Sequence, residues 1–363
     1  MARSKRRWPW LLVAAFLLGA AAWLMLGAEP PEPVRARVSL PRRMSHDERE
    51  RNDARQTWLP LVQLDDAGLP LAPTERPKDP VLAAFPKEVK YAAVVVEANA
   101  IRNSDIGDLL IDCMFGGRPE VMSSFRDAGF DPLTAIDRVS MADNTLLVSG
   151  AFGSADVKGM LRADSSQQWG RRSTLFTSTS PEGRTRISGL WNNQMLVVGS
   201  DEAEVKATLD RLEGVGPANT GKPLVPQEEA YGELYGTLTG AGLAQMVGDE
   251  SPALAQVITD AAGTVRLHAD VSHDVGLVAD IVGTDSQKTE DLRKALGSAL
   301  TLARLQAKAE GRTDEVAILD MAKVGSAEEG SEFRLEAGLP FTFLEKNLKE
   351  CAKKRREERD AGK

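Results

Sequence analysis

Residues 216–222 read GPANTGK, which satisfies the G-x-x-x-x-G-K spacing of a phosphate-binding loop. Such a loop needs a strand before it, a Ser or Thr after the lysine to hold Mg²⁺, and a helix after it whose N-terminus faces the phosphates. Here a helical pattern precedes the motif, Pro223 follows Lys222, and the next residues, PLVPQ, cannot begin a regular helix. We therefore interpret this segment as a linker and not as a nucleotide site.

The residues that most often carry acid–base or metal chemistry are scarce. The chain has three histidines, and two of them, His268 and His273, are five residues apart, which places them on opposite faces of a regular strand. The sequence contains no H-E-x-x-H, C-x-x-C or G-x-S-x-G motif. We predict no cofactor, no metal site and no catalytic residue, and the sequence leaves open a dyad assembled from distant residues.

The chain has two cysteines, Cys113 and Cys351, and Cys113 lies in the apolar stretch LLIDCMF. Cys351 falls on the same helical face as Phe341, Leu344 and Leu348, which is typical of a residue that fills a core. A disulfide between them in an oxidising compartment is the alternative, and the sequence does not decide between the two.

One surface feature could bind a partner. Trp191 stands next to a predicted tight turn formed by Asn192 and Asn193. An exposed aromatic ring at a hairpin would be a binding anchor, so these three residues are the candidate binding surface. The opposite interpretation places Trp191 in the core, because it alternates with other apolar residues along a strand.

The N-terminus carries a candidate membrane anchor. Four basic residues precede an uncharged run from Trp8 to Ala28. As a helix this run would be about 31 Å long, which matches the hydrocarbon thickness of a bilayer. We predict that the run from Trp8 to Ala28 is a single transmembrane helix, so that the lipid bilayer is its binding partner. The alternative is a signal peptide cleaved near Ala20-Ala21-Ala22, which would release a secreted or periplasmic protein.

The cationic N-terminal tail is unfavourable to translocate against a membrane potential. We therefore expect it in the cytoplasm and the body outside, as in a protein of the bacterial inner membrane that faces the periplasm. The formal net charge is −8, and because the first 28 residues carry four basic and no acidic side chains, the rest of the chain carries −12. Such an acidic body argues against nucleic acid as a partner.

The chain divides into five parts by composition. Residues 1–28 are the anchor and residues 29–89 a Pro-rich, charged linker. Two similar α+β parts, at 90–214 and 230–363, are joined by a second linker at 215–229. Each part is predicted to have a mainly antiparallel sheet with helices on one face. The duplication is suggested by a shared order of elements and by LVSGAFGSADVK matching LVADIVGTDSQK at a spacing of 130 residues.

Local patterns predict most elements of both parts. Hairpins are expected to turn near Asp143-Asn144 and near His273-Asp274. A helix capped by Ser200 should bury Val205, Leu209 and Leu212, and the segment DEVAILDMAK at 314–323 is predicted to be a strand.

Three functional hypotheses follow. The first is a non-catalytic envelope protein that acts through protein contacts as an interaction or scaffold module, motivated by the anchor, the duplication and the lack of catalytic motifs. The second is a protein that binds a small ligand or lipid in the groove between the two parts. The third is a hydrolase whose active site follows no local motif.

Overall fold

The computed structural model describes residues 38–55, 79–115, 123, 125–180, 183–215, 223–248, 251–326 and 331–361. The apolar run at 8–28, the segment 56–78 and the GPANTGK motif lie outside these residues, so what the sequence predicts for them stays a prediction. Among the described residues, no helix has both the length and the apolar composition needed to cross a bilayer.

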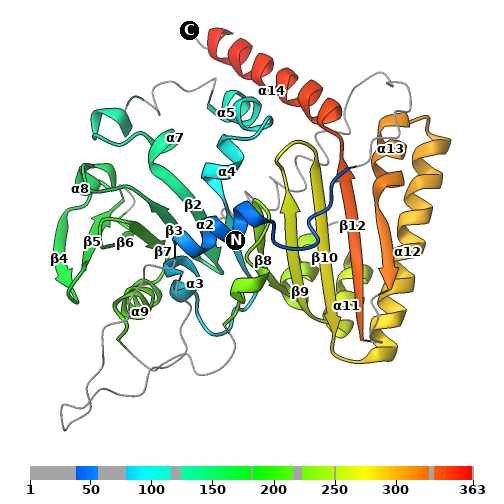
Figure 1. Ribbon diagram of the computed structural model, residues 1–363, viewed down its shortest axis with the longest axis horizontal. Helices are drawn as coiled ribbons and strands as arrows, with labels where there is room; N and C mark the ends of the chain where they lie inside the picture. The colour runs from blue at the N-terminus through cyan, green and yellow to red at the C-terminus, as the bar shows by residue number, and fades with distance from the viewer. Residues whose placement is uncertain are drawn as a thin grey trace.

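The fold is α+β, as predicted, and its centre is one antiparallel sheet (Figure 1). The twelve strands lie in the order β11-β12-β10-β9-β8-β1-β2-β3-β7-β6-β5-β4. The strands of the first part are β1 (Ala92–Val96), β2 (Ile136–Ala142), β3 (Thr145–Gly150), β4 (Ser165–Trp169), β5 (Ser173–Thr179), β6 (Thr185–Trp191) and β7 (Met195–Gly199). Those of the second part are β8 (Leu234–Thr239), β9 (Ala262–Asp270), β10 (Val275–Gly283), β11 (Lys323–Ser326) and β12 (Glu332–Leu339).

Helices precede, connect and follow these strands. In the first part and before it they are α2 (His46–Ala54), α3 (Pro80–Ala84), α4 (Ala98–Arg102), α5 (Gly107–Phe115), α7 (Pro132–Ala135), α8 (Val157–Met160) and α9 (Glu202–Glu213). A short 3-10 helix, η1 (Gln227–Glu229), precedes the second part, whose helices are α10 (Gly240–Val247), α11 (Pro252–Ala261), α12 (Ser286–Ala309), α13 (Thr313–Met321) and α14 (Phe341–Ala361).

The two parts share this sheet because β1 and β8 pair at its middle. Their register runs from Ala92 opposite Leu238 to Val96 opposite Leu234. On each side of this pair the chain forms an antiparallel meander, β1-β2-β3 and β8-β9-β10, with helices between the first and second strands. The structure therefore joins the two parts through main-chain hydrogen bonds.

Alternation along β1 divides the core between the two faces of the sheet. Val95 belongs to a cluster with α3 and α9, whereas Val94 belongs to a cluster with α10, α11 and α12. In the first part, α8 and α9 cover opposite faces, since Leu196 packs with α8 and its neighbour Val197 packs with α9. The prediction of helices on one face is therefore wrong for the first part, because its strands are apolar on both sides.

The sequence match at a spacing of 130 residues is out of register with the sheet. It aligns Leu147 with Leu277, but Leu147 packs in the cluster that contains Val95 and Leu277 packs against the cluster that contains Val94. Because side chains alternate along a strand, a shift of one residue exchanges the two faces. Val278 of β10 is opposite His268 of β9, and His268 is opposite Tyr235 of β8. Because Tyr235 belongs to the same core cluster as Leu147, Val278 lies on the same face of the sheet as Leu147.

Most predicted elements are confirmed, including both hairpins and the buried face of α9, where Val205, Leu209 and Leu212 are fully buried. Two details are wrong. The N-cap of α9 is Asp201, whose carboxylate accepts from the Ala203 amide, and not Ser200. The segment predicted as a strand at 314–323 is mostly helix α13.

The two cysteines form a disulfide. Cys113 of α5 and Cys351 of α14 are bonded, with their Cα atoms 5.2 Å apart and 238 residues between them in sequence. Ile106 and Leu344 are buried beside it in a small cluster that α5 and α14 share. The bond therefore joins a helix of the first part to the last helix of the second.

Candidate functional site

Residues 38–55, called here the N-terminal strap, cross one face of the sheet from the second part to the first (Figure 1). Two glycines allow the strap to lie close to the strands. A Cβ atom at Gly276 of β10 would be 2.0 Å from the Ser39 carbonyl oxygen, and one at Gly338 of β12 would be 3.0 Å from Val38. The strap is thus in contact with the sheet, although the sequence assigned it to a linker.

Helix α2 of the strap is fixed by its own polar residues. Ser45 and Glu48 form a capping box at its start, and the Glu48 carboxylate also accepts from the Gly232 amide before β8. Asn52 is 3% exposed and donates to the Ala230 carbonyl at 2.7 Å. A helix with little apolar surface is therefore held on the body by side-chain hydrogen bonds to the main chain.

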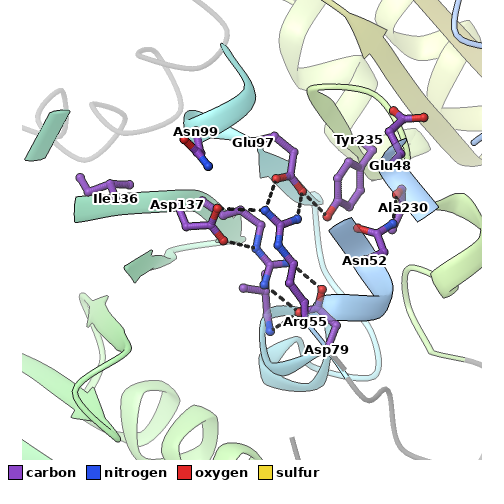
Figure 2. Close-up of polar contacts among 12 residues, drawn as sticks. Glu48, Asn52, Arg55, Asp79, Glu97, Asn99, Ile136, Asp137, Ala230 and Tyr235 are labelled. Carbon is purple, nitrogen blue, oxygen red and sulfur yellow. Dashed lines mark hydrogen bonds and ion pairs between the residues drawn. The ribbon is translucent and has the colours of Figure 1, made fainter. Parts of the chain in front are cut away.

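The strap ends at a buried group of charges, the junction cluster, which Figure 2 shows. Arg55, at the C-cap of α2, donates to Glu97 at 2.9 Å and to Asp137 at 2.9 Å. Tyr235 of β8 donates its hydroxyl to Glu97 at 3.0 Å. The cluster consists of Arg55, Asp79, Glu97, Asp137, Arg138 and Tyr235.

The second guanidinium of the junction cluster binds a single carboxylate through two bonds. Arg138 donates to both oxygens of Asp79, at 2.6 and 3.0 Å. The two side chains are each 3% exposed. Asp79 is also the N-cap of α3, where it accepts from the Val81 amide at 2.8 Å. One carboxylate therefore starts a helix and neutralises a buried charge.

Local backbone features aim these side chains at each other. The register between β2 and β3 shifts between Ile136 and Arg138, so Asp137 is the extra residue of a β-bulge. A bulge breaks the strict alternation of side chains, and Asp137 and Arg138 can then both take part in one cluster. Glu97 follows the last residue of β1 and continues the face of Val95.

Burial and neighbouring charges shift the pKa values of two members of the cluster, Arg138 and Tyr235. Burial by itself would lower the pKa of Arg138, but the Asp79 carboxylate that it binds, together with Tyr235 and Glu97 nearby, raises the pKa above its usual value. Burial and the Glu97 carboxylate raise the pKa of the Tyr235 hydroxyl well above its usual value. Arg138 is therefore charged and Tyr235 neutral over the whole physiological range.

The arrangement suits coupling of segments better than chemistry on a substrate. Glu97 and Asp137 converge on Arg55, and Asp79 is occupied by Arg138. Glu97 is fully buried, so no substrate reaches it in this arrangement. What the cluster does is connect α2, α3, the first part and, through Tyr235, the second part.

No local sequence pattern indicates the junction cluster. Its members are spread from residue 55 to residue 235, and none belongs to a motif with fixed spacing. The only local signal is Asp79-Pro80, which indicates a helix start. That signal predicts the cap of α3 but not the arginine that pairs with it.

The candidate binding surface predicted from sequence is split by the structure. Trp191 is 2% exposed, belongs to the core cluster, and lies under the Arg172 guanidinium, 5.1 Å from its ring centroid. Asn192 and Asn193 are exposed and have φ values of 50° and 53°, as a tight hairpin turn requires. The two asparagines remain available to a partner, whereas the indole ring stabilises the sheet.

A cavity of about 580 Å³ lies at the β11 end of the sheet. Its lining combines apolar residues with the cations Arg42, Arg304, Lys323 and Arg334 and with Glu336, whose carboxylate pairs with Arg42. A Cβ atom at Gly297 of α12, which also lines the cavity, would meet nothing within 4 Å. Glycine in the middle of a helix costs about 1 kcal/mol relative to alanine, so this residue opens space at the expense of helix stability.

His268 and His273 each interact with a different neighbour. The ring of His268 stacks on Tyr231, with 3.9 Å between the centroids, and burial lowers the pKa of His268 below its usual value. His273 is exposed, and its hydrogen bond to Asp105 raises its pKa. Within the described residues, no three His, Cys, Asp or Glu side chains are grouped as a metal site would need.

Comparisons with known proteins give little beyond this geometry. No family model matches the chain, and no curated protein matches it. A solved structure titled "Structure of crystal form I of TP0453" covers 75% of this chain and 98% of its own, with 11% identity and a TM-score of 0.39. A likeness at this level carries no argument about fold or function.

Proposed function

We propose that this chain is a membrane-anchored protein of the cell envelope whose body lies outside the cytoplasm and acts through protein contacts as a non-catalytic interaction or scaffold module. The anchor would be the apolar run at 8–28, with the N-terminal tail in the cytoplasm. The body would be two similar α+β parts derived from a duplication.

The disulfide is the observation that carries the proposal. Disulfides form and persist in oxidising compartments and are rare in the cytosol. Cys113 and Cys351 are the two cysteines of the chain, and they are bonded to each other across 238 residues. This agrees with the orientation that the basic N-terminal tail favours.

The junction cluster supports the scaffold part of the proposal. A tether can position a body only if the two are mechanically coupled. Here the strap that follows the anchor in sequence contacts β10 and β12 at one end and binds Glu97 and Asp137 at the other. Load on the tether would be transmitted to the centre of the sheet.

The test is a combined measurement of compartment and thiol state on the full chain in bacterial cells. The protein should be in the membrane fraction, protease should digest the body in spheroplasts, and a maleimide reagent should add mass only after reduction. A maleimide-reactive protein in the cytosolic fraction would overturn the proposal. Reproducible crosslinked partners are expected for the scaffold role, and their absence would count against that part alone.

The cavity at the β11 end favours a second function, binding of an anionic amphiphile. The volume of about 580 Å³ lies within the usual range of ligand sites, and a lining that combines apolar residues with four cations and one carboxylate could hold an acyl chain with an acidic head group. This site differs from the groove expected from sequence, since β1 and β8 pair directly where the two parts meet.

A substitution that fills the cavity tests this second function. Gly297→Leu places a side chain in open space, so the protein should fold while its affinity for a dansyl-labelled fatty acid falls at least tenfold. Ser298→Leu adds the same side chain at the next residue, which is exposed on α12, and should leave the affinity unchanged. Equal affinities of the wild type and Gly297→Leu would contradict a site in this cavity.

A further inference from the structure

Helix α12 carries the two most exposed large apolar side chains of the described residues. Leu302 is 66% exposed and Leu305 is 61% exposed. Ala307 and Leu292 of the same helix are fully buried. At 3.6 residues per turn, Leu302 and Leu305 lie about 140° and 160° around the helix from Ala307. The two leucines therefore point away from the sheet.

The other exposed large apolar residues in the described part of the chain are scattered. They are Met114, Leu146, Val215 and Val257, and each belongs to a different segment. Single exposed apolar residues are normal on a protein surface, whereas a group of them indicates an interaction site. Leu302 and Leu305 are one helical turn apart and form such a group.

The surface around the two leucines has almost no charge. We call it the α12 outer face, and its exposed residues are Ser298, Ala299, Thr301, Leu302, Leu305, Gln306, Lys308 and Ala309. Lys308 is the one charged member. The sequence has 53 acidic residues, yet none of them lies between Leu292 and Ala309. An acidic body thus has one helix face with no acidic side chain of its own.

The cations of α12 do not decide what this face binds, because most of them have partners within the protein. Arg293 and Lys294 pair with Glu290. Arg304 donates to the Leu319 carbonyl at the end of α13. The α12 outer face therefore offers apolar side chains without acidic neighbours on the helix, and it is not a basic patch.

The outer face is close to the point where the chain arrives from the predicted anchor. Val38, at the start of the N-terminal strap, contacts Gly338 near the end of β12. Figure 1 shows the start of the strap and the C-terminal end of α12 at the same end of β12. Arg42 of the strap and Arg304 of α12 line one cavity, so the two segments are neighbours.

Chain length limits how far this end of the body can be from the bilayer. Ten residue steps separate Val38 from Ala28, the last residue of the predicted span. A fully extended chain advances at most about 3.6 Å per residue, so Val38 lies within about 36 Å of the end of that span. Helix α12 has 24 residues and is itself about 36 Å long, which places its outer face within reach of the bilayer.

We propose that the α12 outer face lies on the phospholipid bilayer that holds the anchor, with Leu302 and Leu305 inserted at the level of the head groups. This inference rests on the proposed anchor. Two leucines are a small apolar contact, but the anchor makes binding of the helix an intramolecular step, so a weak contact is sufficient. A helix with an apolar face and few acids is of the kind that lies in the membrane interface.

A fluorescent probe on the full chain in vesicles of phosphatidylethanolamine and phosphatidylglycerol tests the contact. Both native cysteines are in the disulfide, so an introduced cysteine is the only free thiol. A nitrobenzoxadiazole group on Ala309→Cys should be quenched at least about twofold by spin-labelled phospholipid. The same group on Ser166→Cys of β4 should not be quenched, since β4 is ten strands from β12, about 48 Å along the sheet.

Replacing the leucines separates an apolar contact from mere proximity. Leu302→Ser with Leu305→Ser removes exposed side chains only, so the protein should fold, and quenching of the probe at residue 309 should fall to the level at residue 166. Val215→Ser is the matched control, because Val215 is 53% exposed but lies in another segment, and it should leave quenching unchanged. Equal quenching with and without the two leucines would overturn the inference.

Flotation of the same vesicles distinguishes failure of this inference from failure of the anchor. Protein that floats with the vesicles while the probe at residue 309 is not quenched would overturn the contact of α12 and leave the anchor intact. Protein that does not float would overturn the anchor and the inference with it. Covalent dimers of Leu305→Cys on mild oxidation, without quenching at residue 309, would assign the outer face to a second copy of the chain and contradict the proposal.

Discussion

Replacing Arg138 with methionine should lower the free energy of unfolding by about 3–5 kcal/mol, because it leaves a buried carboxylate without its partner. Arg138 and Asp79 are each 3% exposed and joined by two hydrogen bonds. Solvent cannot replace the lost guanidinium unless the structure opens. Breaking one side of such a pair therefore costs far more than removing an ion pair from the surface.

The companion variant is Asp79→Asn, which keeps the cap of α3 because asparagine is as good an N-cap as aspartate. It should also destabilise the protein, since Arg138 is then buried without a carboxylate opposite it. The double variant should lose at least about 2 kcal/mol less than the sum of the two single variants, because no unpaired charge remains.

Urea unfolding of the three variants and the wild type, followed by circular dichroism, gives these free energies. Glu290→Gln, which removes the exposed partner of Arg293 on α12, is the control and should leave the midpoint unchanged. Additive single effects would show that Arg138 and Asp79 are not coupled, and the assigned role of the junction cluster would be wrong.

Local patterns were sufficient to predict most of the fold. The hairpin at Asp143 and the buried face of α9 follow from turn chemistry and helical periodicity, which act within a few residues. The segment DEVAILDMAK at 314–323 was predicted to be a strand, but most of it is helix α13. Arg304 of α12 binds the Leu319 and Ala322 carbonyls at the end of that helix, and this long-range contact is invisible in the local sequence.

The candidate sites depend on contacts that a single sequence does not encode locally. Arg55 meets Glu97 across 42 residues, and Arg138 meets Asp79 across 59. The sequence around an N-cap aspartate such as Asp79 does not differ between a cap that faces water and one that binds a buried arginine. Strand β4 was missed for a different reason, since SSQQW has no apolar alternation and its pairing depends on β5 alone.

Removing the disulfide should have the second largest effect. The double variant Cys113→Ser, Cys351→Ser should lower the free energy of unfolding by about 2–5 kcal/mol, because the unfolded chain loses a crosslink between distant residues. The bond closes a loop with a sequence separation of 238, and longer loops carry the larger entropic term. Reduction of the wild type should reproduce the effect and should change nothing in the double variant.

The same variant should also loosen α14. Beyond the disulfide, this helix is held to α5 by the small cluster of Ile106 and Leu344 and by an exposed ion pair between Arg356 and Asp112 at 2.9 Å. Amide hydrogen exchange in α14 should therefore accelerate more than exchange in β1 at the sheet centre. Arg356→Gln, which removes only the surface contact between the same helices, should cost less than about 1 kcal/mol. If it destabilised α14 as much as loss of the disulfide does, the crosslink would not be what fixes the last helix to the first part.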